Sequence, residues 1–316
     1  MAHLRANLWL VILTLGLCCV LYPLVLWLVG LVIFRHQAEG SILRVNNKPV
    51  GSRLIAQPFQ GDEYFQPRPS AVNYNASASG GSNLAASNYL LRDRVARTLG
   101  PIVRYQGASP TGKTVQEDIA DWFQTKPKLV AEWAEAHPGV AQAWVNADDK
   151  HKEAVSAWMK THQAEVATWK KKNPGQDPKP ADLAVAFFQS NAAAFHKDWP
   201  KLIDDSSWSV PAVFFDAWLQ ASPDVRLEQV PADMVMTSGS GLDPHITLKN
   251  ARYQLPRIVD AWAKKTGAEK SKVHAAIEKL LEDSAEAPLG GLAGVPLINV
   301  LEVNLALPKA VAGLAK

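Results

Sequence analysis

The sequence predicts a soluble domain of mixed α and β structure (α/β, in the α+β sense), anchored by one N-terminal transmembrane helix and interrupted by a mainly helical insertion. Three features support this: an uncharged apolar run near the N-terminus, short strand and turn signals on both sides of the middle, and a tryptophan-rich middle segment. Of the 316 residues, 47% are hydrophobic, too many for a disordered chain. The predicted division is a tail over 1–7, a transmembrane helix over 8–34, the α/β domain over 35–104 and 230–316, and the insertion over 105–229.

The apolar run lies between Arg5 and Arg35 and contains no charged residue. As a helix it would span about 43 Å, more than the roughly 30 Å core of a bilayer, so it can cross with a tilt or with a kink at Pro23. A cleaved signal peptide is the alternative, but its apolar region would be about half as long and would end at small residues. We therefore expect a single-pass protein of the cell (inner) membrane. The flanking basic residues do not favour an outward position for the C-terminal domain.

The remaining elements follow from turn and capping residues. The predicted elements are a hairpin over 42–56, a helix over 85–99, a short strand over 234–237, a helix capped by Thr247 and reaching about Lys265, and a helix capped by Ser271 and reaching about Asp283. The pattern leaves the type of the apolar run 298–307 open.

Composition excludes several classes of protein. The net charge of +3 gives no basic stripe for nucleic acid. Both cysteines, Cys18 and Cys19, lie in the apolar run, which excludes a disulfide framework, a thiolate metal site and a soluble cysteine nucleophile. The eight histidines are not paired at helical spacing, so no metal site is predicted. No catalytic residue is predicted either, because the chain lacks both a Gly-x-Ser-x-Gly elbow and an Asp-Lys-Thr-Gly phosphorylation motif.

The insertion holds eight of the eleven tryptophans. Several of them recur every 11 residues, a spacing that returns to nearly the same face of a helix and predicts one tryptophan stripe. Pro127 and Pro138 each follow a tryptophan by five positions, so the stripe should be broken into short helices. A helical bundle with a tryptophan core is the favoured interpretation, and a surface that stacks on a carbohydrate or another ligand is the alternative.

Two segments could contact phosphate. Gly107 to Thr114 fits the P-loop pattern through Gly107, Gly112, Lys113 and Thr114, with a possible strand over 102–105 before it. A P-loop domain needs several parallel βα units, which this chain does not suggest, so a linker into the insertion is favoured. The second segment, Gly80-Gly81-Ser82-Asn83, precedes a helix whose N-terminus would favour an anion.

Several blocks carry a resemblance to a known family. They are Tyr22-Pro23-Leu24, Gly40-Ser41-Ile42, Leu54-Ile55-Ala56-Gln57-Pro58-Phe59, Arg68-Pro69-Ser70, Ala78 to Leu84, Thr237 to Ile246, Tyr253 to Arg257 and Val300 to Leu307. With these blocks the chain resembles the KdpC family, one of the components of the Kdp-type potassium-transporting ATPase. The insertion departs from the family, which has a short connection at that point.

The resemblance implies a non-catalytic accessory subunit of an ATP-driven potassium importer. Its partners would be the lipid bilayer, a channel-like potassium-translocating subunit and a P-type ATP-hydrolysing subunit, for which it would act as a catalytic chaperone that raises ATP affinity. No cofactor would be bound tightly, and ATP would be reached through the partner. The family's nucleotide contacts fall here on Gln57 and on Gly80 to Asn83.

The same resemblance places the soluble domain on the outer (periplasmic) side, which conflicts with a contact to cytoplasmic ATP. Asp243, His245 and Asn304 are candidates for partner or ion-path contacts, although turn or capping roles are favoured for each. The alternative function is a membrane-anchored nucleotide-binding protein that uses Gly107 to Thr114.

Overall fold

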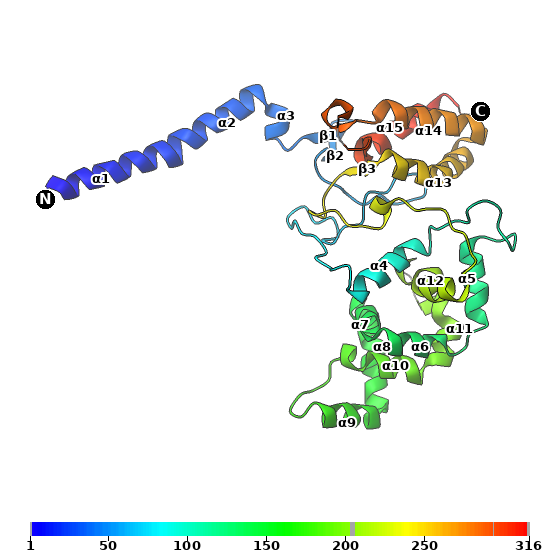
Figure 1. The fold of residues 1–316 in the computed structure, drawn as a ribbon. Coiled ribbons are helices and arrows are strands. Elements are labelled where there is room, and N and C mark those ends of the chain that lie inside the picture. Colours follow the sequence, from blue (N-terminus) through cyan, green and yellow to red (C-terminus); the bar gives the residue numbers. More distant parts are fainter. Residues whose placement is uncertain (1, 203–205, 293, 315–316) are drawn as a thin grey trace. The chain divides into compact units, whose positions relative to one another are not determined.

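The structure is a computed structural model that describes residues 2–202, 206–292 and 294–314. Within these residues the chain is mainly helical, and its strands form two small antiparallel sheets of two strands each (Figure 1). The chain divides into two compact units, Met1–Ser82 with Met236–Lys316 and Asn83–Val235. Mixed α and β structure is therefore present, but helices contribute far more of it than the sequence pattern suggested.

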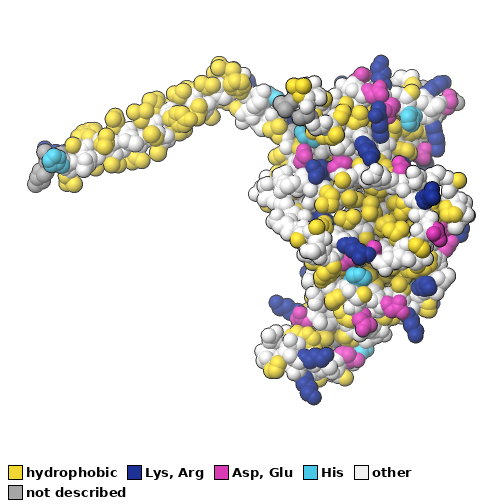
Figure 2. Space-filling view, viewed as in Figure 1, with side chains coloured by type: hydrophobic (Ala, Val, Ile, Leu, Met, Phe, Trp, Pro, Cys, Tyr) yellow, Lys and Arg dark blue, Asp and Glu magenta, His cyan; other side chains and the backbone are white. Residues whose placement is uncertain are grey.

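The N-terminal part of the first unit is one long helix. It comprises α1 (Ala2–Leu15), the π-helical turn η1 (Gly16–Leu21) and α2 (Tyr22–Ile33), followed by the short α3 (Arg35–Ala38). Pro23 lies in the first turn of α2, directly after the π-helical turn. The π-helical turn accommodates the proline, which has no N–H to donate. Residues His3–Ile33 are the only helix among the described residues that is long and apolar enough to cross a membrane. Figure 2 shows its surface covered by hydrophobic side chains.

The hairpin of the first unit is formed by β1 (Ile42–Val45) and β2 (Lys48–Ser52). The hairpin predicted over 42–56 is therefore present, but it ends at Ser52, and residues 53–56 are not part of its second strand. The chain reverses in two residues, because Asn46 and Asn47 both adopt positive φ angles of 50° and 64°. This backbone geometry matches the twist of a tight hairpin, so the second strand begins earlier than expected.

The core of the first unit is built from three helices and a second small sheet. These elements are β3 (His245–Thr247), α13 (Leu248–Thr266), α14 (Lys270–Ser284), β4 (Leu297–Asn299) and α15 (Val300–Ala312), with a 3-10 turn, η5 (Pro288–Gly291), before β4. Their buried side chains include Ile258, Ile277 and Leu307. Figure 1 shows the three helices packed together.

Capping predictions had mixed outcomes in this unit. Thr247 caps α13, since its side chain accepts a hydrogen bond from the Asn250 amide, as predicted. Ser271 is not a cap: α14 begins at Lys270, and the Ser271 hydroxyl donates to the carboxylate of Glu269, the N-cap residue. The predicted strand over 234–237 is absent, because Ala232–Met234 forms a 3-10 turn (η4) instead.

The second unit is a bundle of short helices. They are α4 (Tyr89–Leu99), α5 (Val115–Gln124), α6 (Leu129–Ala136), α7 (Pro138–Ala147), α8 (Asp149–Thr161), α9 (Gln163–Lys172), α10 (Ala184–Ser190), α11 (Ala192–Leu202) and α12 (Val210–Ala221), with 3-10 turns η2 (Pro180–Leu183) and η3 (Ser206–Trp208). The predicted helix over 85–99 begins only at Tyr89, because the Asn88 side chain caps it.

The tryptophans of the second unit do not form one stripe on one helix. Trp133, Trp144 and Trp158 lie on α6, α7 and α8 and are buried in one core. Two of these helices end where a histidine ring nitrogen contacts the tryptophan carbonyl, His137 at Trp133 and His162 at Trp158. The spacing therefore reflects a succession of short helices, each of which carries one tryptophan. These tryptophans form the core of a bundle.

Candidate functional site

The glycine-rich segment near Gly80 packs against a second glycine-rich turn within the first unit. The Gly80 amide donates to the Ser240 carbonyl over 2.9 Å, and the Ser79 hydroxyl donates to the same oxygen over 3.3 Å. Gly241 has a φ of 71°, and a Cβ added there would lie 2.7 Å from the Gly80 carbonyl oxygen. The glycines thus permit close approach of two backbone segments, because neither carries a side chain.

The other residues of the expected nucleotide contact also have partners inside the chain. The Gln57 side-chain amide donates to the Val50 carbonyl over 3.1 Å, next to the β1–β2 hairpin. The Ser82 hydroxyl accepts from the Thr237 hydroxyl over 3.3 Å. Asn83, directly after Ser82, adopts a φ of 49°. The structure therefore places Gln57 at the hairpin and Gly80 at the Ser238–Gly241 turn.

Asp243 and His245 form a pair at the start of β3. One oxygen of Asp243 accepts from the His245 amide (3.0 Å) and contacts His245 Nδ1 (3.1 Å). Its other oxygen lies 3.5 Å from Arg68, which also donates to the Thr237 carbonyl. The hydrogen bond from His245 lowers the pKa of Asp243, so this carboxyl group is ionised at neutral pH. The arrangement fixes the turn that leads into β3.

His245 also lines a polar cleft of the first unit, with a volume of about 270 Å³. Glu286, Asn299 and Glu302 line the same cleft. Arg53 forms ion pairs with both glutamates, at 2.9 Å from Glu286 and 2.8 Å from Glu302, so the two carboxylates share one positive charge. A cation would therefore meet carboxylates that already have a counter-charge. The sequence did not indicate this cluster, because more than 230 positions separate Arg53 from either glutamate.

Asn304 is absent from the lining of this cleft and holds the backbone of Phe65. Its side-chain oxygen Oδ1 accepts a hydrogen bond from the Phe65 backbone amide, and its side-chain nitrogen Nδ2 donates one to the Phe65 backbone carbonyl, each over 2.9 Å. Gln254 makes the same two bonds to Gln66, and Arg257 donates to the carbonyls of two residues just before Phe65. Asn304 thus belongs to a row of side chains that fixes an extended segment, and the structure does not bring it together with Asp243 and His245.

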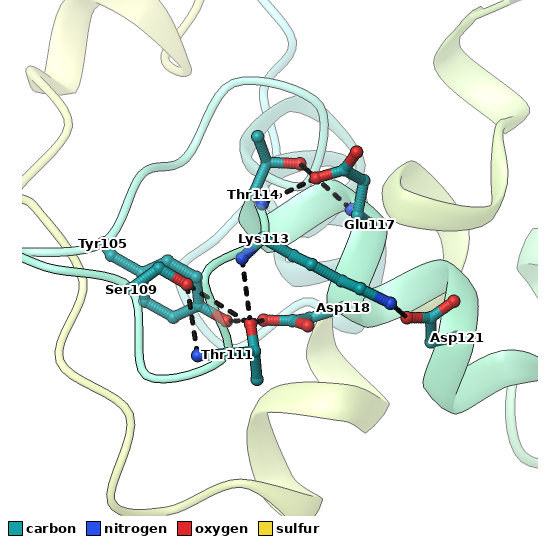
Figure 3. A network of polar contacts seen from close by, with 8 residues as sticks. All are labelled: Tyr105, Ser109, Thr111, Lys113, Thr114, Glu117, Asp118 and Asp121. Carbon is teal, nitrogen blue, oxygen red and sulfur yellow. Dashed lines mark hydrogen bonds and ion pairs between the residues drawn. The ribbon is translucent and has the colours of Figure 1, made fainter.

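The P-loop-like segment of the second unit forms a helix cap. Figure 3 shows Thr114 and Glu117 in a reciprocal pair at the start of α5, in which Thr114 accepts from the Glu117 amide and Glu117 accepts from the Thr114 amide. The Lys113 ammonium donates to Asp121 on the same helix, and this contact raises the pKa of Lys113. Gly107 and Gly112 have φ angles of 88° and 75° and serve the bends of the loop.

The surroundings of this segment also differ from those of a P-loop. Asp118 accepts from the hydroxyls of Thr111 and Tyr105 (Figure 3). Among the described residues, no strand lies directly before the loop. Tyr105 makes only an isolated bridge to Leu227. The strand predicted over 102–105 is therefore wrong. The lysine and threonine that would bind phosphate and magnesium are used to start and brace α5.

No other cluster in the described parts of the chain suggests a metal. Residues 2–202, 206–292 and 294–314 contain no group of three or more His, Cys, Asp or Glu side chains placed to hold an ion. The cysteines Cys18 and Cys19 lie in the long N-terminal helix and are free.

Comparison with known proteins assigns the family. The family described as "K+-transporting ATPase, c chain" matches residues 4–121 and 188–309. The chain is 27% identical over 286 residues to the potassium-transporting ATPase KdpC subunit of Caldanaerobacter subterraneus subsp. tengcongensis, with 90% of this chain and 84% of that protein covered. It is 27% identical over 302 residues to that of Clostridium kluyveri (95% and 91% covered) and 48% identical over 97 residues to that of Methanosphaerula palustris (29% and 52% covered).

The unmatched residues 122–187 contain α6 to α9, the part in which the tryptophans recur. This range is narrower than the insertion predicted over 105–229, which in turn lies within the compact unit Asn83–Val235. The match covers nearly all of the long N-terminal helix, the hairpin, the Gly80 segment and the core of the first unit, and it includes every candidate residue discussed above. The chain belongs to the family of KdpC subunits of the potassium-transporting ATPase.

Proposed function

We propose that this chain is a single-pass accessory subunit that stabilises the assembly of an ATP-driven potassium importer. Its partners in this proposal are a channel-like potassium-translocating subunit and a P-type ATP-hydrolysing subunit in the inner membrane. The family match and the one membrane-length helix among the described residues, His3–Ile33, support the proposal. The soluble part would lie on the outer side, so that only the anchor reaches the cytoplasmic face.

The observation that carries this proposal is that the groups expected to contact nucleotide are already bonded to other groups of this chain. The Gly80 amide is bonded to Ser240 and the Lys113 ammonium to Asp121. A phosphate would have to displace these partners, so the structure favours action through protein contacts. A rise in the ATP affinity of the hydrolysing subunit would then pass through the anchor and the neighbouring subunits.

The test is to purify the complex through a tag on the ATP-hydrolysing subunit, with and without this chain. We expect omission of the chain to reduce the yield of intact complex and to raise the KM for ATP. Lys113→Ala should leave both quantities unchanged. Equal yield and equal KM without the chain would contradict the proposal, as would ATP binding by the chain alone that Lys113→Ala abolishes.

Orientation needs its own measurement. Ala275 is exposed on α14, so a cysteine placed there in a Cys18→Ser, Cys19→Ser background should be reachable from solvent. We expect a membrane-impermeant maleimide to label it in intact spheroplasts. Labelling only after the membrane is opened would place the soluble part on the cytoplasmic side.

A further inference from the structure

The exposed large apolar side chains of the first unit are concentrated in two segments beyond the anchor. Val45 and Leu54, in and beside the hairpin, are 42% and 61% exposed, and Leu292 and Val295, in the loop before β4, are 91% and 54% exposed. Outside these segments only Met236, at 39%, is comparable in the described part of the unit beyond the anchor. A chance distribution would have placed some on α13, α14 and α15, which form the core of the unit and expose none to this degree.

The hairpin is tied to the point where the chain leaves the anchor. The Ser52 hydroxyl donates to the Gly40 carbonyl over 2.7 Å, and the Arg53 amide donates to the Ser41 carbonyl over 3.0 Å. Gly40 lies seven positions after Ile33, the last residue of α2. Seven residues span at most about 25 Å, and the helical turn α3 shortens this distance. The hairpin must therefore lie close to the membrane surface if the anchor crosses the bilayer.

The loop 287–296 is tied to the hairpin through the residues at its ends. Glu286, directly before the loop, makes an ion pair of 2.9 Å with Arg53, and Leu297, directly after it, exchanges two backbone hydrogen bonds with Glu286. The loop contains no charged residue. Exposure of a Leu side chain to water in such a loop is unfavourable, because its apolar surface would be stabilised by burial.

Charge distinguishes the kind of partner. Arg44 and Lys48 are exposed on the hairpin, and neither makes an ion pair with any residue that the structure describes. Basic side chains beside exposed apolar ones are typical of surfaces that bind anionic lipid headgroups, where the apolar groups enter the interface and the cations are attracted to the negative headgroups.

We infer that the β1–β2 hairpin and the exposed side chains of Leu292 and Val295 before β4 form a second membrane contact, which binds the headgroup region of anionic lipids beside the anchor. This contact rests on the membrane crossing in the proposed function. It would hold the first unit against the bilayer and limit its rotation about the anchor.

The test uses the full chain in lipid nanodiscs, both alone and in the complex with which it co-purifies. Single cysteines at Leu292, at Leu54 and at the control position Ala275, each in the Cys18→Ser, Cys19→Ser background, carry an environment-sensitive fluorophore. Lipids that carry a nitroxide near the headgroup serve as quenchers. The nanodiscs contain either neutral phosphatidylcholine alone or phosphatidylcholine with added anionic phosphatidylglycerol.

We expect blue-shifted, quenched emission at positions 292 and 54 and unchanged emission at 275, both for the chain alone and in the complex. Phosphatidylglycerol should increase the quenching, and Arg44→Gln with Lys48→Gln should abolish this increase. Emission at 292 and 54 equal to that at 275 would overturn the inference, as would quenching that disappears in the complex, since a partner subunit would then cover the surface. If a labelled chain co-purifies normally with the complex but its fluorophore is not quenched, only the lipid contact is refuted. If the chain leaves the membrane, the anchoring is refuted as well.

Discussion

Asn304 makes both backbone hydrogen bonds of Phe65, although 239 positions separate the two residues in the sequence. Both residues are almost fully buried, at 2% and 1% exposure. The Asn304 side chain thus takes the place of a neighbouring strand, satisfying an amide and a carbonyl that could not otherwise be buried without cost. This bond pair joins α15 to the extended segment that follows the hairpin.

Asn304→Ala should lower the stability of the first unit by about 2–4 kcal/mol, because it leaves two buried backbone groups unsatisfied. Asn304→Asp keeps only the acceptor when its carboxyl is ionised, so it should also be less stable than wild type. Thermal unfolding of the detergent-solubilised chain, followed by near-ultraviolet circular dichroism, checks both. Lys309→Ala, at an exposed position of the same helix, is the control and should not change the transition. An Asn304→Ala transition that coincides with wild type would contradict this role.

Local signals in the sequence predicted the elements whose cause is local. The long apolar N-terminal helix follows from an uncharged run, and the start of α13 follows from Thr247 and its bond to the Asn250 amide. The start of α14 could not be predicted in the same way. Glu269 and Ser271 are both plausible cap residues, and the backbone of Glu269, with a ψ of 131°, is the one that leaves the helix.

Contacts between distant segments explain what the sequence did not reveal. The partners of Asn304 and Arg53 lie more than 230 positions away, and no spacing rule connects them. The tryptophan spacing and the prolines predicted short helices around a tryptophan core, which α6, α7 and α8 confirm, but they did not predict that a histidine four positions after a tryptophan would end the helix. His137 and His162 do this for α6 and α8, so the period describes helix length as well as helix face.

Gly241→Ala should disrupt the packing of the Gly80 segment. The added Cβ would lie 2.7 Å from the Gly80 carbonyl oxygen and 2.8 Å from Val72, at a φ of 71° that disfavours alanine. We expect a loss of about 1–3 kcal/mol and faster amide hydrogen exchange at Gly80, whose donor bond to Ser240 would lengthen.

Gly239→Ala is the matched control for this substitution. Gly239 lies in the same turn, has no positive φ, and a Cβ there would meet nothing within 4 Å. Its exchange rates and unfolding transition should remain those of wild type. Equal effects of the two substitutions would mean that the loss does not come from the close approach of Gly241 to Gly80, which would contradict the role assigned to Gly241.

Lys113→Ala should not change nucleotide binding, in contrast to the same substitution in a P-loop. The ammonium is paired with Asp121 on the exposed face of α5, and the Thr114 hydroxyl is used in the cap. Titration of the full chain with a fluorescent ATP analogue checks this, with Thr114→Ala as a companion variant. Thr114→Ala should instead lower helix stability by about 1 kcal/mol through loss of the cap. Saturable binding that either variant removes would restore the nucleotide-binding alternative.

Asp93→Asn should stabilise the second unit at neutral pH. Asp93 lies on α4 beside His137, and one of its oxygens is buried without a hydrogen-bond partner among the described residues. Burial raises the pKa of Asp93, even though His137 and Arg97 oppose this change. Replacing a buried, incompletely paired charge by a neutral amide should therefore add about 1 kcal/mol.

The sign of the pH dependence separates this explanation from a loss or gain of packing. A carboxyl group with a raised pKa in the folded state takes up its proton more readily when folded, so wild type gains stability as the pH falls from neutrality through that raised pKa toward about 4. Asp93→Asn cannot gain it, so its advantage should shrink over the same pH range. Urea unfolding monitored by tryptophan fluorescence suits the measurement, because eight of the eleven tryptophans lie in the second unit. Glu135→Gln, at an exposed position of α6, should show no such pH-dependent difference, and a constant advantage of Asp93→Asn from about pH 7 to pH 4 would contradict the assignment to charge burial.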